Sequence, residues 1–341
     1  MGTCARSAKL VGLRRIGLHH ERRRQSDPHN RRSSAASSGV AAEGRGVVKI
    51  LRSTTAETRL SINTATLGNP PLQTALDAIA TAGARNVGLW RETYEGMSPT
   101  QAARAVTDHG LQVSTLCRCV LTPDAAMMSD ARRAADDAYE LGAQALVVLA
   151  GGLPPGSHDL DGTRRRMIDT LGELVPIAEE AGVRIALEPL HPMFTASRSV
   201  VNTLRQALDI VAPFPAEQVG VVIDTFNVWW DPELTEQLGR AGRENRIAAL
   251  QIADWSRDHE HGPFLTRALP GDGIIDLPAI LAAVDHAGFR GPIEIEIFND
   301  QLWLQPGQHI ADEAMKSMSA ILRAISSSRS ISEMGRQYST Q

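Results

Sequence analysis

From Arg59 onward the chain alternates, eight times over, a short β-rich run with a longer stretch of helical pattern. The β-rich runs are 59–67, 86–90, 112–118, 145–151, 184–190, 219–224, 247–254 and 292–297. The helical stretches are 71–82, 98–108, 124–141, 162–180, 203–212, 233–241, 276–286 and 310–322. Near-continuous apolar runs are typical of parallel strands buried on both faces, so this alternation indicates a sheet covered by helices.

The joints between helices and strands support this interpretation. Five of them place a Gly where the preceding helix would end in the left-handed conformation, as at Gly110 and Gly182. Eight consecutive strand–helix units close most naturally into a barrel, so we predict a (β/α)8 TIM barrel over residues 59–325. The alternative, an open doubly wound sheet, needs a Gly-rich phosphate loop after the first strand, and residues 66–71 do not form one.

The segments outside this repeat have a different composition. Residues 1–58 show no sustained period and hold 12 Lys/Arg against 4 Asp/Glu. They bury too little apolar surface to offset their ordering entropy, so we expect a disordered Arg/Ser-rich tail. An organelle transit peptide, a nucleic-acid-binding arm and a mistaken start are further interpretations. Residues 326–341 are expected to form a flexible C-terminal tail.

Charge and apolar content limit the possible partners. The chain after residue 58 holds 23 basic and 35 acidic residues, and an acidic body repels phosphate backbones, so we expect no nucleic acid. No apolar run approaches the roughly 20 residues that cross a bilayer, so we expect no membrane insertion.

The cysteines are too few for a disulfide framework, which favours a reducing cytoplasm. Cys117 and Cys119 are expected on one face of a strand. We interpret them as buried small side chains, although a metal or redox pair is an alternative.

The late strands end in side chains that suit a metal ion. These are Glu188, Asp224, Gln251, Asp254, Glu294 and Glu296. Burying a carboxylate without a partner is costly, and active sites of this fold form at the C-terminal strand ends. One such residue alone could be a structural ion pair, but several at corresponding strand ends indicate a site for a hard divalent cation.

The segments around these residues resemble the late-strand motifs of sugar phosphate isomerase/epimerase proteins, within the xylose-isomerase-like superfamily. The matching segments are 188–193, 224–232, 251–255, 271–277 and 288–298. Relatives in this superfamily include ketose epimerases, inosose dehydratases and isomerases and, more remotely, endonuclease IV. The resemblance covers nearly all of 59–323.

The resemblance implies one divalent metal, with Mn²⁺ first and Mg²⁺ or Co²⁺ as alternatives. In the family a Glu, an Asp, a His and a Glu bind it, and the matching positions are Glu188, Asp224, Gln251 and Glu296. Glu296 is preferred to Glu294 because the family ligand lies five residues beyond the Gly that matches Gly291. Strand alternation is then expected to point Glu294 away from the barrel interior.

Two positions depart from the family pattern. Gln251 and Asn227 stand where the family has His, and an amide oxygen suits transition metals less well than imidazole does, so we expect weaker metal affinity. The family's catalytic pair, Glu188 and Glu296, is retained. The resemblance implies that this pair carries a proton to and from the carbon next to a carbonyl, which the metal polarises.

Other side chains near the strand ends are candidates for substrate contact. His191 follows strand five as an additional acid/base or as a loop-packing residue. Arg267 would clamp a hydroxyl-rich or anionic substrate, or be a solvated loop charge. All five tryptophans follow strand ends, where they could pack on a sugar ring. The predicted substrate-binding residues are Asn227, Asp254, Arg267, Trp90, Trp230 and Trp255.

These observations favour a metal-dependent isomerase or epimerase that abstracts a proton next to the carbonyl of a sugar, keto-sugar or cyclitol. A lyase is the first alternative, because the same enolate can expel a β-leaving group such as water or an aglycone. A non-catalytic or partner-dependent barrel is the second. The expected partner is a small carbohydrate, with assembly into a homo-oligomer or, alternatively, a hetero-oligomer.

Overall fold

The computed structural model describes the backbone of residues 56–122, 125–257 and 262–338. Side chains are described for the same residues up to 326, with the exception of Ala125. The expected N-terminal tail, 1–58, lies outside these residues apart from its last three, which belong to the 3₁₀ helix Ala56–Arg59. In the described ranges no helix is long and apolar enough to span a membrane.

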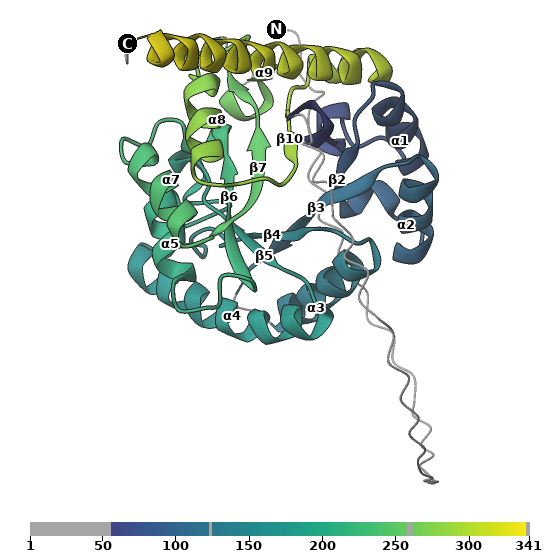
Figure 1. The fold of residues 1–341 in the computed structure, drawn as a ribbon. Helices are drawn as coiled ribbons and strands as arrows, with labels where there is room; N and C mark the ends of the chain where they lie inside the picture. The colour runs from purple at the N-terminus through teal and green to yellow at the C-terminus, as the bar shows by residue number, and fades with distance from the viewer. Residues whose placement is uncertain (1–55, 123–124, 258–261, 339–341) are drawn as a thin grey trace, which may run out of the picture. The chain divides into compact units, whose positions relative to one another are not determined.

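Eight parallel strands close into a barrel, which confirms the predicted fold (Figure 1). In chain order they are β1 Leu60–Asn63, β2 Asn86–Trp90, β3 Gln112–Val120, β4 Ala145–Leu149, β5 Ile185–Glu188, β6 Val219–Asp224, β7 Ile247–Ile252 and β10 Ile293–Ile295. Strand β1 pairs with both β2 and β10, and this pairing closes the ring. Closure leaves no unpaired sheet edge in the barrel.

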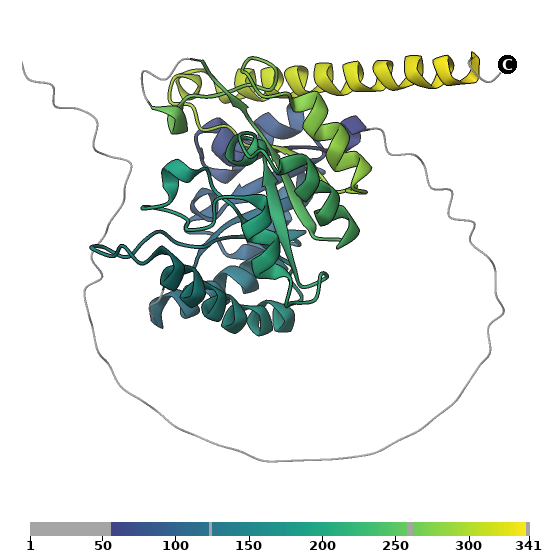
Figure 2. The same ribbon diagram turned by 90° about the vertical axis from the view of Figure 1, so that its left-hand side faces the viewer.

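Helices surround the barrel on its outside (Figure 1). They are α1 Leu72–Thr81, α2 Pro99–Asp108, α3 Ala125–Glu140, α4 Leu160–Ala181, α5 Leu204–Val211, α7 Leu234–Arg243, α8 Leu277–His286 and α9 Gly307–Tyr338, with a single turn, α6 Thr225–Val228, after β6. The α9 helix contacts α1 and α8, and Figure 2 shows that it continues past α8. The expected flexible tail 326–341 is therefore helical as far as Tyr338.

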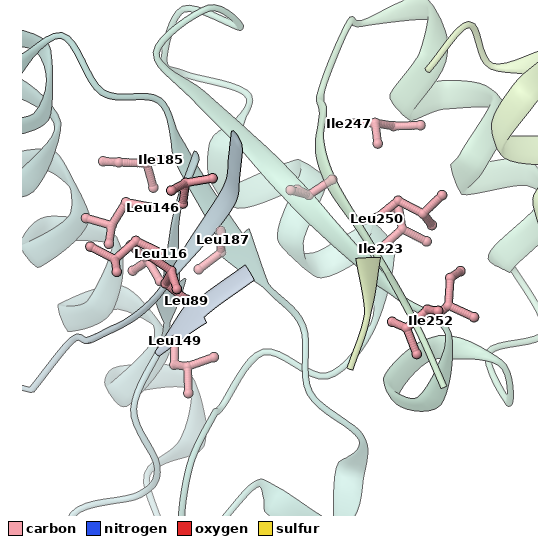
Figure 3. Packing of buried hydrophobic residues seen from close by; sticks show 14 of the residues in the cluster. Leu89, Leu116, Leu146, Leu149, Ile185, Leu187, Ile223, Ile247, Leu250 and Ile252 are labelled. Carbon is pink, nitrogen blue, oxygen red and sulfur yellow. The ribbon is translucent and has the colours of Figure 1, made fainter. Parts of the chain in front are cut away.

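Two apolar layers hold this architecture together. The larger lies between strands and helices, and Figure 3 shows part of it, including Leu116, Leu146 and Ile223. The smaller lies inside the barrel and consists of short side chains, which fit the narrow interior. Its buried members are Cys117, Ala145, Val147, Ala186, Val222 and Ala249.

Local signals in the sequence explain where the elements end. Gly110 and Gly182 have φ of 69° and 74°, the left-handed conformation in which glycine ends a helix without strain. Capping boxes begin α2 at Ser98 and α5 at Thr203. Strand β1 ends earlier than the predicted 59–67, because the Asn63 side chain accepts from the Ala65 amide and begins a 3₁₀ helix.

The cysteine prediction is correct in one respect and wrong in another. Cys117 and Cys119 are both buried, as expected. They do not share a face, because the register of β3 against β4 shifts between them. Cys117 lies in the layer inside the barrel and Cys119 in the layer under the helices.

Candidate active site

Neighbouring strand ends bring the four predicted metal ligands to one end of the barrel. Glu188 and Asp224 are the last residues of β5 and β6, Gln251 lies in β7, and Glu296 directly follows β10. In the register, Asp224 is the partner of Gln251. All four side chains are buried, with exposures of 7% or less. Buried carboxylates need charge-neutralising partners, so their contacts define the site.

Asn227 joins the first two carboxylates. Its Nδ2 donates to Glu188 Oε1 at 2.9 Å and to Asp224 Oδ2 at 2.6 Å. Its Oδ1 accepts from the backbone amide of His191 at 3.1 Å, which fixes the orientation of the amide group. Asn227 therefore contacts the predicted ligands as a donor, at the position where the family has His.

Arg267 joins Asp224 to Glu296. Its Nη1 lies 3.2 Å from Asp224 Oδ2 and 3.6 Å from Glu296 Oε2. The guanidinium also lies over the ring of Phe226 at 4.2 Å. Arg267 reaches the barrel because a two-stranded antiparallel sheet, β8 Asp254–Trp255 with β9 Arg267–Ala268, folds the long loop after β7 back over the strand ends.

Burial raises the pKa of each of these carboxyl groups. The pKa of Glu296 rises to about 8, chiefly through burial, with Asp224 and Glu294 adding to the rise and Arg267 opposing it. Burial, then the charges of Asp224 and Glu296, raises the pKa of Glu188 well above its usual value. Carboxyl groups with raised pKa can give and take protons near neutral pH.

Gln251 presents an unused acceptor in this setting. Its Nε2 donates to Glu294 Oε1 at 2.9 Å. Its Oε1 is buried and has no hydrogen-bond partner among the described residues. A buried acceptor without a partner lowers the stability of the folded state by about 1–3 kcal/mol. A bound cation would be a suitable partner for this oxygen. Carboxylate and amide oxygens are the kinds of donor that hard divalent ions prefer.

Glu294 points into the barrel, contrary to the prediction. Its carboxylate accepts hydrogen bonds from β1, β3 and β7, across the interior, and it is 1% exposed. Residues two apart in a strand share a face, so Glu294 and Glu296 both face inward. The partners of Glu294 are Asn63, Ser114, Thr115 and Gln251.

Glu296 also belongs to a second group of potential metal ligands. Atoms of Cys117, Glu294 and Glu296 fall within 4.8 Å of one another. Burial, and then the neighbouring carboxylates, raises the pKa of the Cys117 thiol well above its usual value, which disfavours the thiolate that binds metals. The Glu294 oxygens already accept hydrogen bonds from several donors. Among the described residues, Cys117, Glu294 and Glu296 are the one group of carboxylate, thiol and imidazole ligands that lie this close together.

Two predicted residues lie close to these groups and three lie elsewhere. Trp90 Nε1 donates to Glu296 Oε1 at 3.2 Å, and Trp90 and Arg267 line the cavity beside Glu188 and Glu296. Asp254 instead accepts the backbone amides of Gly271, Gly273 and Ile275, which fastens the loop before α8. Trp230 and Trp255 do not line the cavity.

His191 lies in an aromatic group rather than at the carboxylates. Its ring centroid is 5.0 Å from that of Trp255 and 5.7 Å from that of Trp230. Its Nδ1 accepts from the Met193 amide at 3.3 Å, and burial lowers its pKa. These contacts match the loop-packing interpretation of His191.

The same cavity has lining residues that the sequence did not single out. They are Arg118, Arg198, Leu190, Phe194, Phe264 and Phe298. Arg118 was detectable as a charge within the apolar run of β3. Arg198 lies in a loop between β5 and α5, where nothing in the sequence pattern distinguishes it.

Known proteins match both this fold and this sequence. A protein of Sinorhizobium meliloti of known structure is 39% identical, with a TM-score of 0.74 over 78% of this chain and 98% of its own. The inosose isomerase of Bacillus subtilis is 35% identical over 158 residues, which are 45% of this chain and 54% of that protein. The 3-dehydroshikimate dehydratase of Pseudomonas aeruginosa is 28% identical over 261 residues, which are 71% of this chain and 38% of that protein.

The chain thus spans about half the length, or less, of these two curated relatives. The model of the xylose isomerase-like TIM barrel family matches residues 76–321, which include every strand of the barrel except β1. This chain belongs to the xylose isomerase-like TIM barrel family.

Proposed function

We propose that this barrel is a divalent-metal-dependent isomerase or epimerase that moves a proton at the carbon next to the carbonyl of a sugar, keto-sugar or cyclitol. The observation that carries the proposal is the unpaired, buried Gln251 Oε1, on a residue that is the register partner of Asp224, together with the burial of Glu188, Asp224 and Glu296 at the strand ends. The named activity of the inosose isomerase relative supports the reaction class.

Glu188, Asp224, Gln251 and Glu296 would hold the metal, with Mn²⁺ as the preferred ion and Mg²⁺ or Co²⁺ as alternatives. When bound, such an ion supplies polarisation of the substrate carbonyl, which makes the adjacent C–H acidic. Arg267 pairs with Asp224 and Glu296, so in the metal-free protein it neutralises charge that a bound metal ion would neutralise instead. With the metal bound, Arg267 is expected to be available to substrate oxygens.

Glu188 and Glu296 are the proposed proton carriers. Both line the cavity in which the substrate would bind, and burial raises the pKa of both. A base works best when its pKa is near the working pH, so raised carboxyl pKa values suit abstraction of a weakly acidic proton. Trp90 and Arg267 hold Glu296 in place, and Asn227 holds Glu188.

A lyase is the second candidate, and the dehydratase relatives favour it. Matches to 3-dehydroshikimate dehydratases run along 71% of this chain, a longer stretch than the match to the inosose isomerase. In a lyase the same proton is removed first. The enolate then re-forms the carbonyl, its electrons form the double bond between the α- and β-carbons, and the β-hydroxyl takes a proton from an acidic group of the site and leaves as water with its bonding pair.

We also propose a cytoplasmic location and self-association. The two described cysteines are free and buried, which fits a reducing compartment.

Proton NMR in D₂O tests the function. The full chain with Mn²⁺ is incubated with an inosose, a ketohexose and 3-dehydroshikimate, with EDTA and the Glu188→Gln variant as controls. An isomerase gives deuterium next to the carbonyl and a new isomer, whereas a lyase gives a new olefinic or aromatic signal. Absence of both exchange and product with all three compounds, or turnover that persists in EDTA, contradicts the proposal.

A further inference from the structure

We propose that Arg118 and Arg198 form a carboxylate-binding site, so that the substrate of this barrel carries a carboxylate group in addition to its carbonyl group. The inference rests on the proposed function, because it names the substrate class of the same cavity. Both side chains line that cavity together with Glu188 and Glu296.

Arg118 offers a hydrogen-bond donor that nothing in the described chain uses. Its guanidinium lies over the Trp90 ring, 4.3 Å from the ring centroid. Its Nη1 is buried and has no hydrogen-bond partner among the described residues. Stacking on Trp90 holds the guanidinium in one plane, which prepares it for an oxygen of a bound ligand.

Arg198 lines the same cavity and lies on the loop after β5. Its guanidinium lies 4.2 Å from the centroid of the Phe264 ring and 5.3 Å from that of Phe194. It makes no side-chain hydrogen bond or ion pair with any residue that the structure describes. Burial, and then the positive charges of Arg118 and Arg267, lowers the pKa of Arg198, whereas the charges of Glu188 and Glu296 oppose that shift.

The nearby carboxylates are held by other groups. Glu188 takes its hydrogen bond from Asn227, and Asp224 and Glu296 pair with Arg267. Arg118 and Arg198 therefore have carboxylates nearby but no hydrogen-bonded anion, so a ligand oxygen can make contacts that the protein leaves unmade. The structure accounts for Arg267 within the protein but leaves Arg118 and Arg198 for a ligand.

The shape of the ligand follows from the lining. A carboxylate has two oxygens and can accept from one guanidinium on each side. The rings of Trp90, Phe194, Phe264 and Phe298 also line the cavity, where they pack on the arginines and on one another. An apolar lining of this kind suits the carbon skeleton of a compact substrate, so we infer one that carries a carboxylate in addition to its ketone and hydroxyl groups.

Binding of an acid and of its methyl ester tests the proposal. Shikimate and methyl shikimate differ in charge and hardly in shape, and isothermal titration of each into the full chain measures the preference directly. We expect shikimate to bind at least about tenfold more tightly than the ester. The preference should persist in EDTA, because it comes from the arginines, and equal affinity for the two compounds would overturn the proposal.

Variants assign the preference to the two arginines. Arg118→Gln and Arg198→Gln should each weaken shikimate binding about tenfold or more and leave ester binding unchanged. Arg118→Lys should restore part of the loss. The matched control is Arg205→Gln, which removes an exposed arginine paired with Glu233 at 2.9 Å on the outer surface and should have no effect. Unchanged shikimate affinity in both glutamine variants would refute the assignment.

A second pair of compounds tests whether the site prefers a phosphate group to a carboxylate group. Fructose 6-phosphate and fructose are titrated in the same way, and a preference confined to the phosphate pair would overturn the carboxylate assignment. Because these are binding measurements, they are independent of turnover. Exchange of a neutral keto-sugar proton with no preference for shikimate would remove this inference and leave the proposed function standing.

Discussion

Replacing Glu296 with Gln is expected to stabilise the metal-free barrel at high pH, although it removes a proposed proton carrier. The folded-state pKa of Glu296, about 8, lies above its ordinary value of 4.5, mainly because of burial. The stability that this carboxyl group contributes is therefore fully present below about pH 4.5 and is lost as the pH rises through about 8. Gln has no charge to bury, so the variant avoids this loss.

The magnitude follows from the same interval. The difference between 4.5 and about 8 corresponds to about 5 kcal/mol at 1.36 kcal/mol per pKa unit. This figure already includes the opposing charge of Arg267, and it is an upper limit because it also includes the charge of Asp224, whose own pKa is raised by burial. Trp90 keeps an acceptor, since a Gln oxygen can replace Glu296 Oε1. We expect the stability of the variant relative to the wild type to increase by about 2–4 kcal/mol between pH 5 and pH 9.

Urea unfolding in EDTA, followed by tryptophan fluorescence at pH 5, 7 and 9, measures this difference. Glu313→Gln, a change on the outer surface of α9 where Glu313 pairs with Lys316, is the matched control and should show little dependence of its stability difference on pH. A stability difference between Glu296→Gln and the wild type that stays constant across this range would show that Glu296 is not buried as a strained carboxylate, and would refute the reasoning.

Three further changes test other parts of the site. Glu188→Gln should lower kcat/KM by at least a factor of about 100, measured on whichever compound gives exchange in D₂O, and a loss below about tenfold would mean that Glu188 carries no proton. Glu294→Ala should lower the free energy of unfolding by about 3–5 kcal/mol, because it leaves the buried amides of Asn63 and Gln251 unpaired. Glu294→Gln should cost only about 1 kcal/mol, since its oxygen can accept from both amides, and similar urea midpoints for the two variants would contradict this account. Gln251→His should tighten Mn²⁺ or Co²⁺ binding in isothermal titration, because Glu294 is placed to accept a ring N–H and orient the imidazole, and weaker binding would mean that position 251 does not face the ion.

The barrel could be predicted because its signal is repeated and local. Each buried parallel strand needs an apolar run, and each helix end needs a residue that tolerates its backbone, so errors were confined to the ends of elements. The predicted strand 247–254 divides into β7 and β8, for example, because Asp254 turns to bind the backbone amides of the following loop. Hydrogen bonds of this kind join distant residues and leave no periodic pattern.

The site was predictable in part. Carboxylates inside apolar runs stand out in a sequence, and in the structure Asn227 links Glu188 to Asp224 while Arg267 links Asp224 to Glu296. The prediction that Glu294 points away from the barrel interior was wrong, because residues two apart in a strand share a face and Glu296 points inward. Its partners come from β1, β3 and β7, so the network could not be found from any one segment.

The arginines of the cavity show a different limit. Arg267 was a candidate because it precedes a matching motif, but its pairing with Asp224 and Glu296 depends on the antiparallel sheet in the loop after β7. Arg118 lies on β3 and Arg198 on the loop after β5, and both line one cavity although they are far apart in the sequence. Convergence of like charges across a cavity has no signature in a sequence.

Titration of Mn²⁺ into the full chain tests the central claim most directly, namely that Glu188, Asp224, Gln251 and Glu296 form the metal site. The account predicts one ion per chain, with affinity reduced at least about tenfold by Asp224→Asn and unchanged by Cys117→Ala. The Cys117 variant separates this site from the neighbouring group of Cys117, Glu294 and Glu296. No binding at all, or binding that is lost in Cys117→Ala and kept in Asp224→Asn, would contradict the account.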